Sequence, residues 1–211
     1  MPNEGTARVK GAVDIMIHPG VRAWAQNAME ALVRPLARIG IQPNTITTLG
    51  FVLSLVAAAA VWQGMWPWAA FLVLVASAFD MLDGALARVS DRGTTFGAFF
   101  DSTLDRLSEA AICLGLIGYF LARQDDQTVL GVVLMLVGSQ MVSYTRARAE
   151  GLGLSCTVGW FQRPERVIAL GLALLFPDSL GIVLEIVIWM LAVLTLLTTV
   201  QRVFHVWYQS R

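Results

Sequence analysis

Charge is the scarcest property of this sequence. Only 14% of its 211 residues are Asp, Glu, Lys or Arg, whereas a soluble domain carries about 25%. Lysine is almost absent, and Lys10 is its single example. The two cysteines are too few for a disulfide framework. The formal net charge is zero, so bulk charge predicts no nucleic-acid partner.

Apolar residues, in contrast, are plentiful and make up 56% of the chain. They gather in runs that match a hydrocarbon core about 30 Å thick, which a helix of about 20 residues crosses. The N-terminus lacks the basic-then-apolar pattern of a cleaved signal peptide, so the first run is expected to target the chain to a membrane. Backbone groups in lipid must bond within their own segment, which makes each run a helix. The sequence therefore predicts an all-α integral membrane protein with six spans: Ile46–Gln63, Pro67–Val89, Thr95–Leu121, Thr128–Arg148, Pro164–Phe176 and Leu180–Trp207.

The basic residues lie almost entirely in one set of loops. They precede the first span, follow the second, flank the loop after the fourth and close the chain, whereas the alternate loops hold only Arg123. By the positive-inside rule, both termini are expected in the cytoplasm. The sequence thus predicts a multi-pass protein of the cytoplasmic membrane, in contact with membrane lipids.

An amphipathic segment precedes the first span. Apolar residues such as Val21, Met29 and Leu36 recur there at helical spacing with arginines between them, which is typical of a helix that lies in the membrane interface. A helix packed against the cytoplasmic side of the protein is the alternative. Residues 1–45 are therefore interpreted as a cytoplasmic N-terminus with an interfacial helix, and residues 46–211 as the six-helix transmembrane domain.

Four aspartates fall in the hairpin between the second and third spans. Residues three or four apart share a helical face, so Asp80 and Asp83 line one stripe, and Asp101 and Asp105 line another. The connecting loop is short, which predicts that the two helices are antiparallel neighbours and that the four carboxylates converge. Carboxylates inside a membrane are costly unless paired, and Mg²⁺ or Mn²⁺ would neutralise them because hard cations favour carboxylate oxygens. Paired ions of this kind catalyse displacement at phosphorus.

The hairpin also carries a recognisable motif. The pattern D-x2-D-G-x2-A-R-x8-G-x3-D-x3-D runs from Asp80 to Asp105 without a departure. It resembles the signature of the CDP-alcohol phosphotransferase family, and the six spans behind an interfacial helix resemble that family as well. The resemblance implies an acceptor alcohol that attacks the phosphorus bearing a lipid, with CMP as the leaving group. It also implies a homodimer.

The resemblance assigns roles to residues of this chain. Two Mg²⁺ or Mn²⁺ ions per subunit would be held by Asp80, Asp83 and Asp101, with Asp105 sharing in the ligation. Asp105 would also be the general base of the catalytic domain. The residues that would surround the nucleotide are Thr48, Gly84, Ala87, Arg88 and Gly97.

Arginines near the cytoplasmic ends of the later spans indicate the acceptor. Arginine forks match phosphate oxygens bidentately, so a phosphorylated polyol fits, although positive-inside anchors are the simpler interpretation. The strings SYTRARAE and RPER resemble the phosphatidylinositol-phosphate synthase branch. That resemblance implies CDP-diacylglycerol or an ether analogue as donor and inositol phosphate as acceptor, with glycerol phosphate as the alternative acceptor. The candidate phosphate-binding residues are Arg146, Arg148, Arg163, Arg166 and Arg202.

Two other classes of protein also place charges in a membrane. Carboxylates mark ion pathways, so a divalent-cation transporter is an alternative, but it explains neither Gly84, Ala87 and Arg88 nor the fixed spacing. A non-catalytic scaffold with structural ion pairs predicts that Asp105→Asn leaves function intact.

Overall fold

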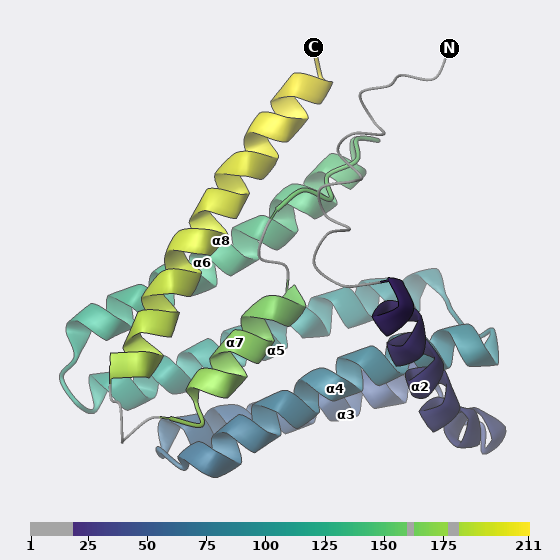
Figure 1. Ribbon diagram of the computed structural model, residues 1–211, viewed down its shortest axis with the longest axis horizontal. Helices are drawn as coiled ribbons and strands as arrows, with labels where there is room; N and C mark the ends of the chain where they lie inside the picture. The colour runs from purple at the N-terminus through teal and green to yellow at the C-terminus, as the bar shows by residue number, and fades with distance from the viewer. Residues whose placement is uncertain (1–18, 160–162, 177–181) are drawn as a thin grey trace.

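The computed structural model is helical throughout the residues that it describes, 19–159, 163–176 and 182–211, and these contain no β-strand (Figure 1). Residues 1–18 of the predicted N-terminal segment and the predicted start of the last span at Leu180 lie outside these ranges. The helices are α2 (Pro19–Arg38), α3 (Pro43–Trp62), α4 (Trp66–Ser90), α5 (Thr95–Leu121), α6 (Asp126–Glu150), α7 (Arg163–Ala173) and α8 (Ile182–Gln209).

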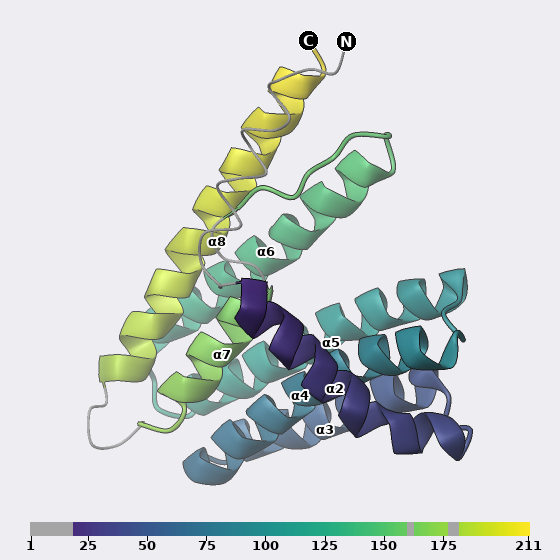
Figure 2. The same cartoon turned by 45° about the vertical axis from the view of Figure 1, so that its right-hand side comes forward.

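The helices form two groups, which are joined by the packing of α5 on α6 and by α7. In the first group α3 packs against both α4 and α5. In the second, α6 packs along α8, and this pair leans away from the first group (Figure 1, Figure 2). The short α7 contacts α4 on one side and α8 on the other. This places the start of α7 beside the middle of the first group.

Helices α4 and α5 have fewer close backbone contacts with each other than each of them has with α3. Gly115 of α5 approaches the backbone of α3 so closely that an added Cβ would overlap the carbonyl of Ala58. Gly50 of α3 meets α4 in the same way, and a Cβ there would lie 3.0 Å from Cβ of Phe79. Small residues at helix contacts permit such approaches. Space therefore remains between α4 and α5 for charged side chains.

Four of the described helices, α3, α4, α6 and α8, are long and apolar enough to cross a membrane. Among the other two predicted spans, α5 carries Asp105, Arg106 and Glu109 in its middle. Helix α7 has only 11 residues, or about 16 Å at 1.5 Å per residue. It begins at Arg163 and ends at Ala173, before the predicted end at Phe176, because the chain continues into tight turns.

The first long helix also begins earlier than predicted, at Pro43 rather than Ile46. Proline suits the first turn of a helix, since its missing N–H has no partner there anyway. The preceding helix α2 ends at Arg38. Gly40 takes a positive φ of 81°, and the N–H of Ile41 donates to the carbonyl of Leu36 at 3.2 Å. These are the features of a glycine-terminated helix.

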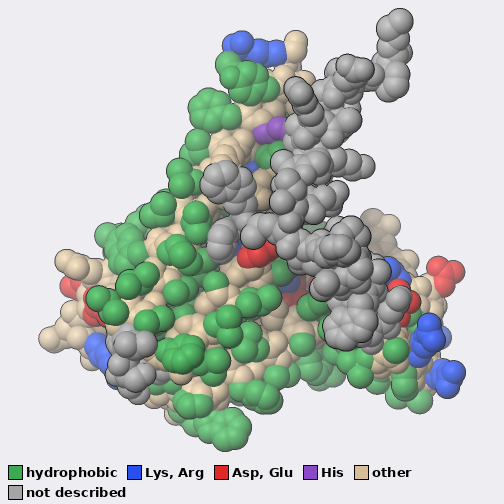
Figure 3. All heavy atoms as spheres, viewed as in Figure 1, with side chains coloured by type: hydrophobic (Ala, Val, Ile, Leu, Met, Phe, Trp, Pro, Cys, Tyr) green, Lys and Arg blue, Asp and Glu red, His purple; other side chains and the backbone are tan. Residues whose placement is uncertain are grey.

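Two apolar clusters hold the helices together. The larger one contains residues from all six helices between α3 and α8, and it includes the fully buried side chains of Val61, Leu116 and Ile188. In the smaller one, Val33 of α2 packs with Leu86 of α4. Outside these clusters many large apolar side chains are exposed, and Figure 3 shows them spread over a broad face while charged side chains gather near helix ends. Such a surface suits lipid better than water.

Candidate active site

The four motif aspartates lie on either side of the space between α4 and α5. Asp83 on α4 is 4% exposed, and its Oδ2 accepts a hydrogen bond from the Thr47 hydroxyl of α3 at 2.6 Å. Asp80 also faces α3, because a Cβ added to Gly50 would lie 3.5 Å from its Oδ1. Helix α3 thus supplies both a hydrogen-bond donor and the room that these carboxylates need.

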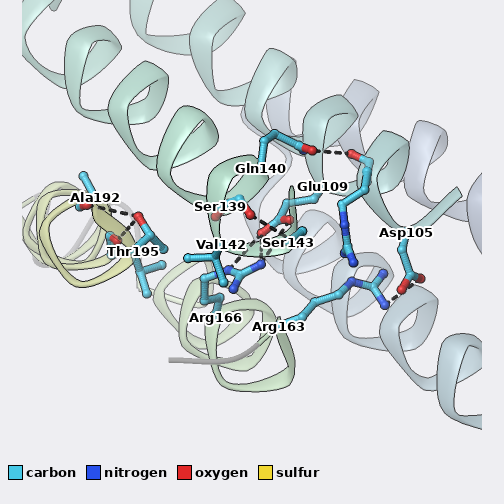
Figure 4. Close-up of polar contacts among 12 residues, drawn as sticks. Asp105, Glu109, Ser139, Gln140, Val142, Ser143, Arg163, Arg166, Ala192 and Thr195 are labelled. Carbon is cyan, nitrogen blue, oxygen red and sulfur yellow. Dashed lines mark hydrogen bonds and ion pairs between the residues drawn. The ribbon is translucent and has the colours of Figure 1, made fainter. Parts of the chain in front are cut away.

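Arg163, the first residue of α7, connects the two helices of the motif. Its Nη2 lies 2.7 Å from Oδ2 of Asp80 on α4, and its Nη1 lies 2.6 Å from Oδ1 of Asp105 on α5. Figure 4 shows the guanidinium pointing at the Asp105 carboxylate. All three side chains are largely shielded, with exposed fractions of 14–21%. A positive charge therefore sits between two of the predicted metal ligands.

Asp101 completes the group. Its charge interacts with those of Asp80, Asp83 and Asp105, so the four carboxylates do converge as the spacing predicts. Its Oδ1 is buried and accepts no hydrogen bond from the described residues. Within the same residues, no three acidic, histidine or cysteine side chains enclose an ion-sized space as they stand. The guanidinium of Arg163 accounts for this, since it separates Asp80 from Asp105.

A pocket of about 220 Å³ opens beside the carboxylates at the ends of α3, α4 and α5. A glycine at position 97 keeps the wall of this pocket free of a side chain, because a Cβ there would lie 3.0 Å from Oγ1 of Thr94 and 3.1 Å from Oδ1 of Asn44. Thr94 also caps α5, because its hydroxyl accepts a hydrogen bond from the Gly97 N–H at 2.9 Å. The pocket is lined by Pro43, Asn44, Thr47, Asp83, Gly84, Ala87, Arg92, Gly93, Thr94, Gly97, Ala98 and Asp101.

The predicted nucleotide residues divide between this pocket and its edge. Gly84, Ala87 and Gly97 line it. Arg88 is exposed, and its Nη1 lies over Gly84, 3.6 Å from where a Cβ would be. Thr48 is not among the lining residues, and its exposed hydroxyl donates to the Asn44 carbonyl at 2.8 Å. The sequence reasoning missed its neighbour Thr47, although a buried carboxylate one helix away requires such a donor.

The predicted phosphate-binding arginines have separate environments. Arg166 is 3% exposed and forms a two-pronged pair with Glu109 of α5, at 3.0 and 3.2 Å (Figure 4). Arg202, also 3% exposed, donates through Nε to the Val158 carbonyl at 2.8 Å and through Nη1 to the Val142 carbonyl. Arg146 pairs with Glu150 at 2.8 Å on the exposed end of α6, and Arg148 is exposed. Only Arg163 contacts the aspartates directly.

Comparison with known proteins defines the class of this site. Residues 41–206, which include the whole motif, match the family described as CDP-alcohol phosphatidyltransferase. The chain therefore belongs to the CDP-alcohol phosphatidyltransferase family. Membership favours a transferase over the cation-transporter alternative.

Within the family, the chain is similar to phosphatidylinositol phosphate and archaetidylinositol phosphate synthases. The chain is 36% identical over 179 residues to the phosphatidylinositol phosphate synthase of Mycobacteroides abscessus, which covers 83% of this chain and 81% of the relative. It is 38% identical over 204 residues to the archaetidylinositol phosphate synthase of Methanothermobacter thermautotrophicus, which covers 92% of this chain and 100% of the relative.

Solved structures agree with this placement. The crystal structure of Mycobacterium tuberculosis phosphatidylinositol phosphate synthase with CDP-DAG bound matches with a TM-score of 0.78 and 36% identity, over 85% of this chain and 93% of that one. The same enzyme in complex with manganese and citrate matches with a TM-score of 0.77 and 37% identity, over 85% and 88%.

Proposed function

We propose that this protein transfers a phosphatidyl-type group from a CDP-linked lipid, CDP-diacylglycerol or its ether analogue, to inositol phosphate and releases CMP. The observation that carries the proposal is the joint position of pocket and carboxylates. Asp83 and Asp101 belong to both, so a nucleotide in the pocket would hold its phosphates against the motif. The similarity to bacterial and archaeal inositol-phosphate enzymes supports the choice of acceptor.

The nucleotide would be held mainly by the shape of the pocket. Gly84, Ala87 and Gly97 keep the pocket open where larger side chains would fill it. Arg88 and Arg92, at the cytoplasmic end of α4 and just beyond it, supply positive charge for a diphosphate. Thr48 lies at the edge of this group, so its proposed contact is with the outer part of the nucleotide.

The donor set fits divalent ions. Asp80, Asp83, Asp101 and Asp105 present only oxygen, which Mg²⁺ and Mn²⁺ prefer. Two features of the structure favour a cation here: the buried Oδ1 of Asp101 accepts no hydrogen bond, and Arg163 already places positive charge between Asp80 and Asp105. Two ions per subunit would stabilise the attacking and leaving oxygens. The manganese complex of the related synthase supports this assignment.

Asp105 is proposed as the general base. It takes the proton of the acceptor hydroxyl as the acceptor oxygen bonds to the phosphorus that carries the lipid, and the bond from that phosphorus to CMP breaks. Its contact with Arg163 at 2.6 Å holds the carboxylate in place. Arg163 lies next to the reacting groups, and Arg146, Arg148, Arg166 and Arg202 complete the proposed basic side of the acceptor site.

The test is an acceptor competition with purified protein in detergent. CDP-diacylglycerol is supplied with Mg²⁺ or Mn²⁺ and with inositol phosphate, glycerol phosphate, inositol or serine, and CMP release is measured. The highest kcat/KM is expected for inositol phosphate, and chelation of the metal is expected to abolish turnover. Preference for glycerol phosphate would make the alternative acceptor correct. Metal flux in liposomes without CMP release would instead support a transporter.

The proposed arrangement in the membrane has six spans, with α5 and α7 added to the four apolar helices and α2 in the interface. Both termini and the active site are assigned to the cytoplasm. Residues 1–45 would form the interfacial segment and residues 46–211 the catalytic domain of each subunit of a homodimer. The packing of α2 on α4 is compatible with an interfacial position, since Leu32 on the same helix is 60% exposed.

This topology is testable by thiol labelling in intact cells. Gln124→Cys, after α5, is expected to react with an impermeant maleimide added outside, whereas Leu152→Cys, after α6, is not. The native cysteines should not react with the maleimide because both are buried, and burial raises the pKa of the Cys156 thiol. Labelling of position 152 from outside would reverse the orientation. The mass of the purified particle in detergent tests the homodimer.

A further inference from the structure

The arginines near the active site differ in how many of their donors are already used. Arg166 gives two nitrogens to Glu109. Arg202 gives two to backbone carbonyls that fix the chain after α6. These hydrogen bonds have a structural role, because breaking them would leave a buried carboxylate or buried carbonyls without a partner.

Arg106 of α5 stands apart from this set. Its Nη1 is buried and has no hydrogen-bond partner among the described residues, and the same is true of Nε of Arg163. Unpaired donors of charged groups are among the costliest to bury. The charge of Arg106 also interacts with the positive charges of Arg163 and Arg166. The acidic charges that act on it include those of Asp105 and Glu109, which already pair with Arg163 and Arg166, and that of Asp101.

Two buried guanidinium nitrogens without a hydrogen-bond partner, one on Arg106 and one on Arg163, are donors that a phosphate group can use. Arg106 follows Asp105 on α5, and its charge interacts with those of Asp105 and Arg163, so the guanidinium lies near the proposed base. A small polyol phosphate has a hydroxyl and a phosphate separated by a few bonds, and thus fits both. The backbone here is held by the side-chain amide of Gln140 on α6, which donates to the Arg106 carbonyl at 3.3 Å.

We propose that Arg106 binds the phosphate group of the acceptor, together with Arg163. This rests on the proposed function and adds to it a residue that neither the motif nor the loop arginines indicate. Arg106 makes the site specific for a phosphorylated alcohol, since an unphosphorylated one leaves the two donors unpaired. Arg166 and Arg202 then hold α7 and the loop before it around this site.

The test compares Arg106→Gln and Arg106→Lys with the wild-type protein. We measure the KM for inositol phosphate, the KM for CDP-diacylglycerol and the melting temperature, and the equilibrium binding of inositol phosphate by calorimetry. Loss of a charge-assisted hydrogen bond predicts an increase of about ten- to a hundred-fold in the acceptor KM and Kd of Arg106→Gln. The KM for the lipid should not change, and Arg106→Lys should recover part of the loss. Arg123→Gln, at the far end of the same helix, is the matched control and should behave as wild type.

The possible results separate this inference from the proposed function. If wild type uses inositol phosphate but Arg106→Gln keeps its acceptor KM and Kd, the inference is wrong and the function stands. Equal increases in both KM values with a lower melting temperature would make Arg106 structural, and also overturn it. If wild type prefers glycerol phosphate, the same increase is expected for that acceptor. If wild type uses only unphosphorylated alcohols, both the proposed acceptor and the role of Arg106 fail.

Discussion

The Asp105→Asn variant is expected to release CMP about 10²- to 10⁴-fold more slowly than wild type, the usual contribution of a general base. Asparagine has nearly the same shape and keeps an oxygen beside the Arg163 guanidinium, but it does not accept the acceptor's proton. The initial rate of CMP release at saturating CDP-diacylglycerol and inositol phosphate measures the effect. Because the pocket residues are unchanged, the affinity for the CDP-lipid should remain within a few-fold of wild type.

A carboxylate far from the site supplies the control for this variant. Asp126 is exposed in the first turn of α6, at the end of the molecule opposite the motif. Asp126→Asn should therefore keep the wild-type rate and melting temperature. An undiminished rate in Asp105→Asn would exclude Asp105 as the base and return the scaffold hypothesis to consideration. A loss of rate accompanied by an equal loss of CDP-lipid binding would point to misfolding instead.

The convergence of the aspartates was predictable because it depends on short-range geometry. Spacings of three and four residues fix which side chains share a helical face, and a short loop returns the chain beside itself. The sequence could not show that α4 and α5 each pack closely on α3, since this depends on contacts such as the approach of Gly115 to Ala58. It also gave no indication of the hydrogen bond from Thr47 to Asp83. Adjacent helical positions differ by about 100°, so Thr47 faces Asp83 whereas Thr48 faces away.

Contacts between distant residues were the least accessible to sequence reasoning. Arg163 lies 83 residues after Asp80, and no local pattern indicates that α7 folds back to place it there. The sequence grouped Arg163 and Arg166 with three other arginines as candidate phosphate ligands because all of them lie near the predicted cytoplasmic ends of the later spans. In the structure one of them contacts the motif aspartates and the other pairs with Glu109 in the interior. Position in the chain predicted their side of the membrane but not their partners.

The buried pair of Arg166 and Glu109 leads to a second prediction with a large expected effect, here on the stability of the protein. Glu109→Gln is expected to lower the free energy of unfolding by about 3–5 kcal/mol, because it leaves Arg166 in the interior without its carboxylate. The pair lies at 3% and 12% exposure and joins α5 to α7, so its loss should also loosen the helix that carries Arg163. Thermal unfolding in detergent, followed by circular dichroism, measures the change.

The exposed pair Arg146–Glu150 on α6 is a matched control, since Glu150→Gln removes the same group from side chains that are 47% and 50% exposed. Pairs four residues apart on an exposed helix are worth only about 0.3–0.5 kcal/mol, so Glu150→Gln should hardly change the melting temperature. Replacing both partners, Glu109→Gln with Arg166→Met, should recover much of the lost stability because no unpaired charge then stays buried. Equal effects of the two Glu→Gln variants would show that the α5–α7 pair does not hold α7 in place. The position of Arg163 would then depend on its own contacts with Asp80 and Asp105.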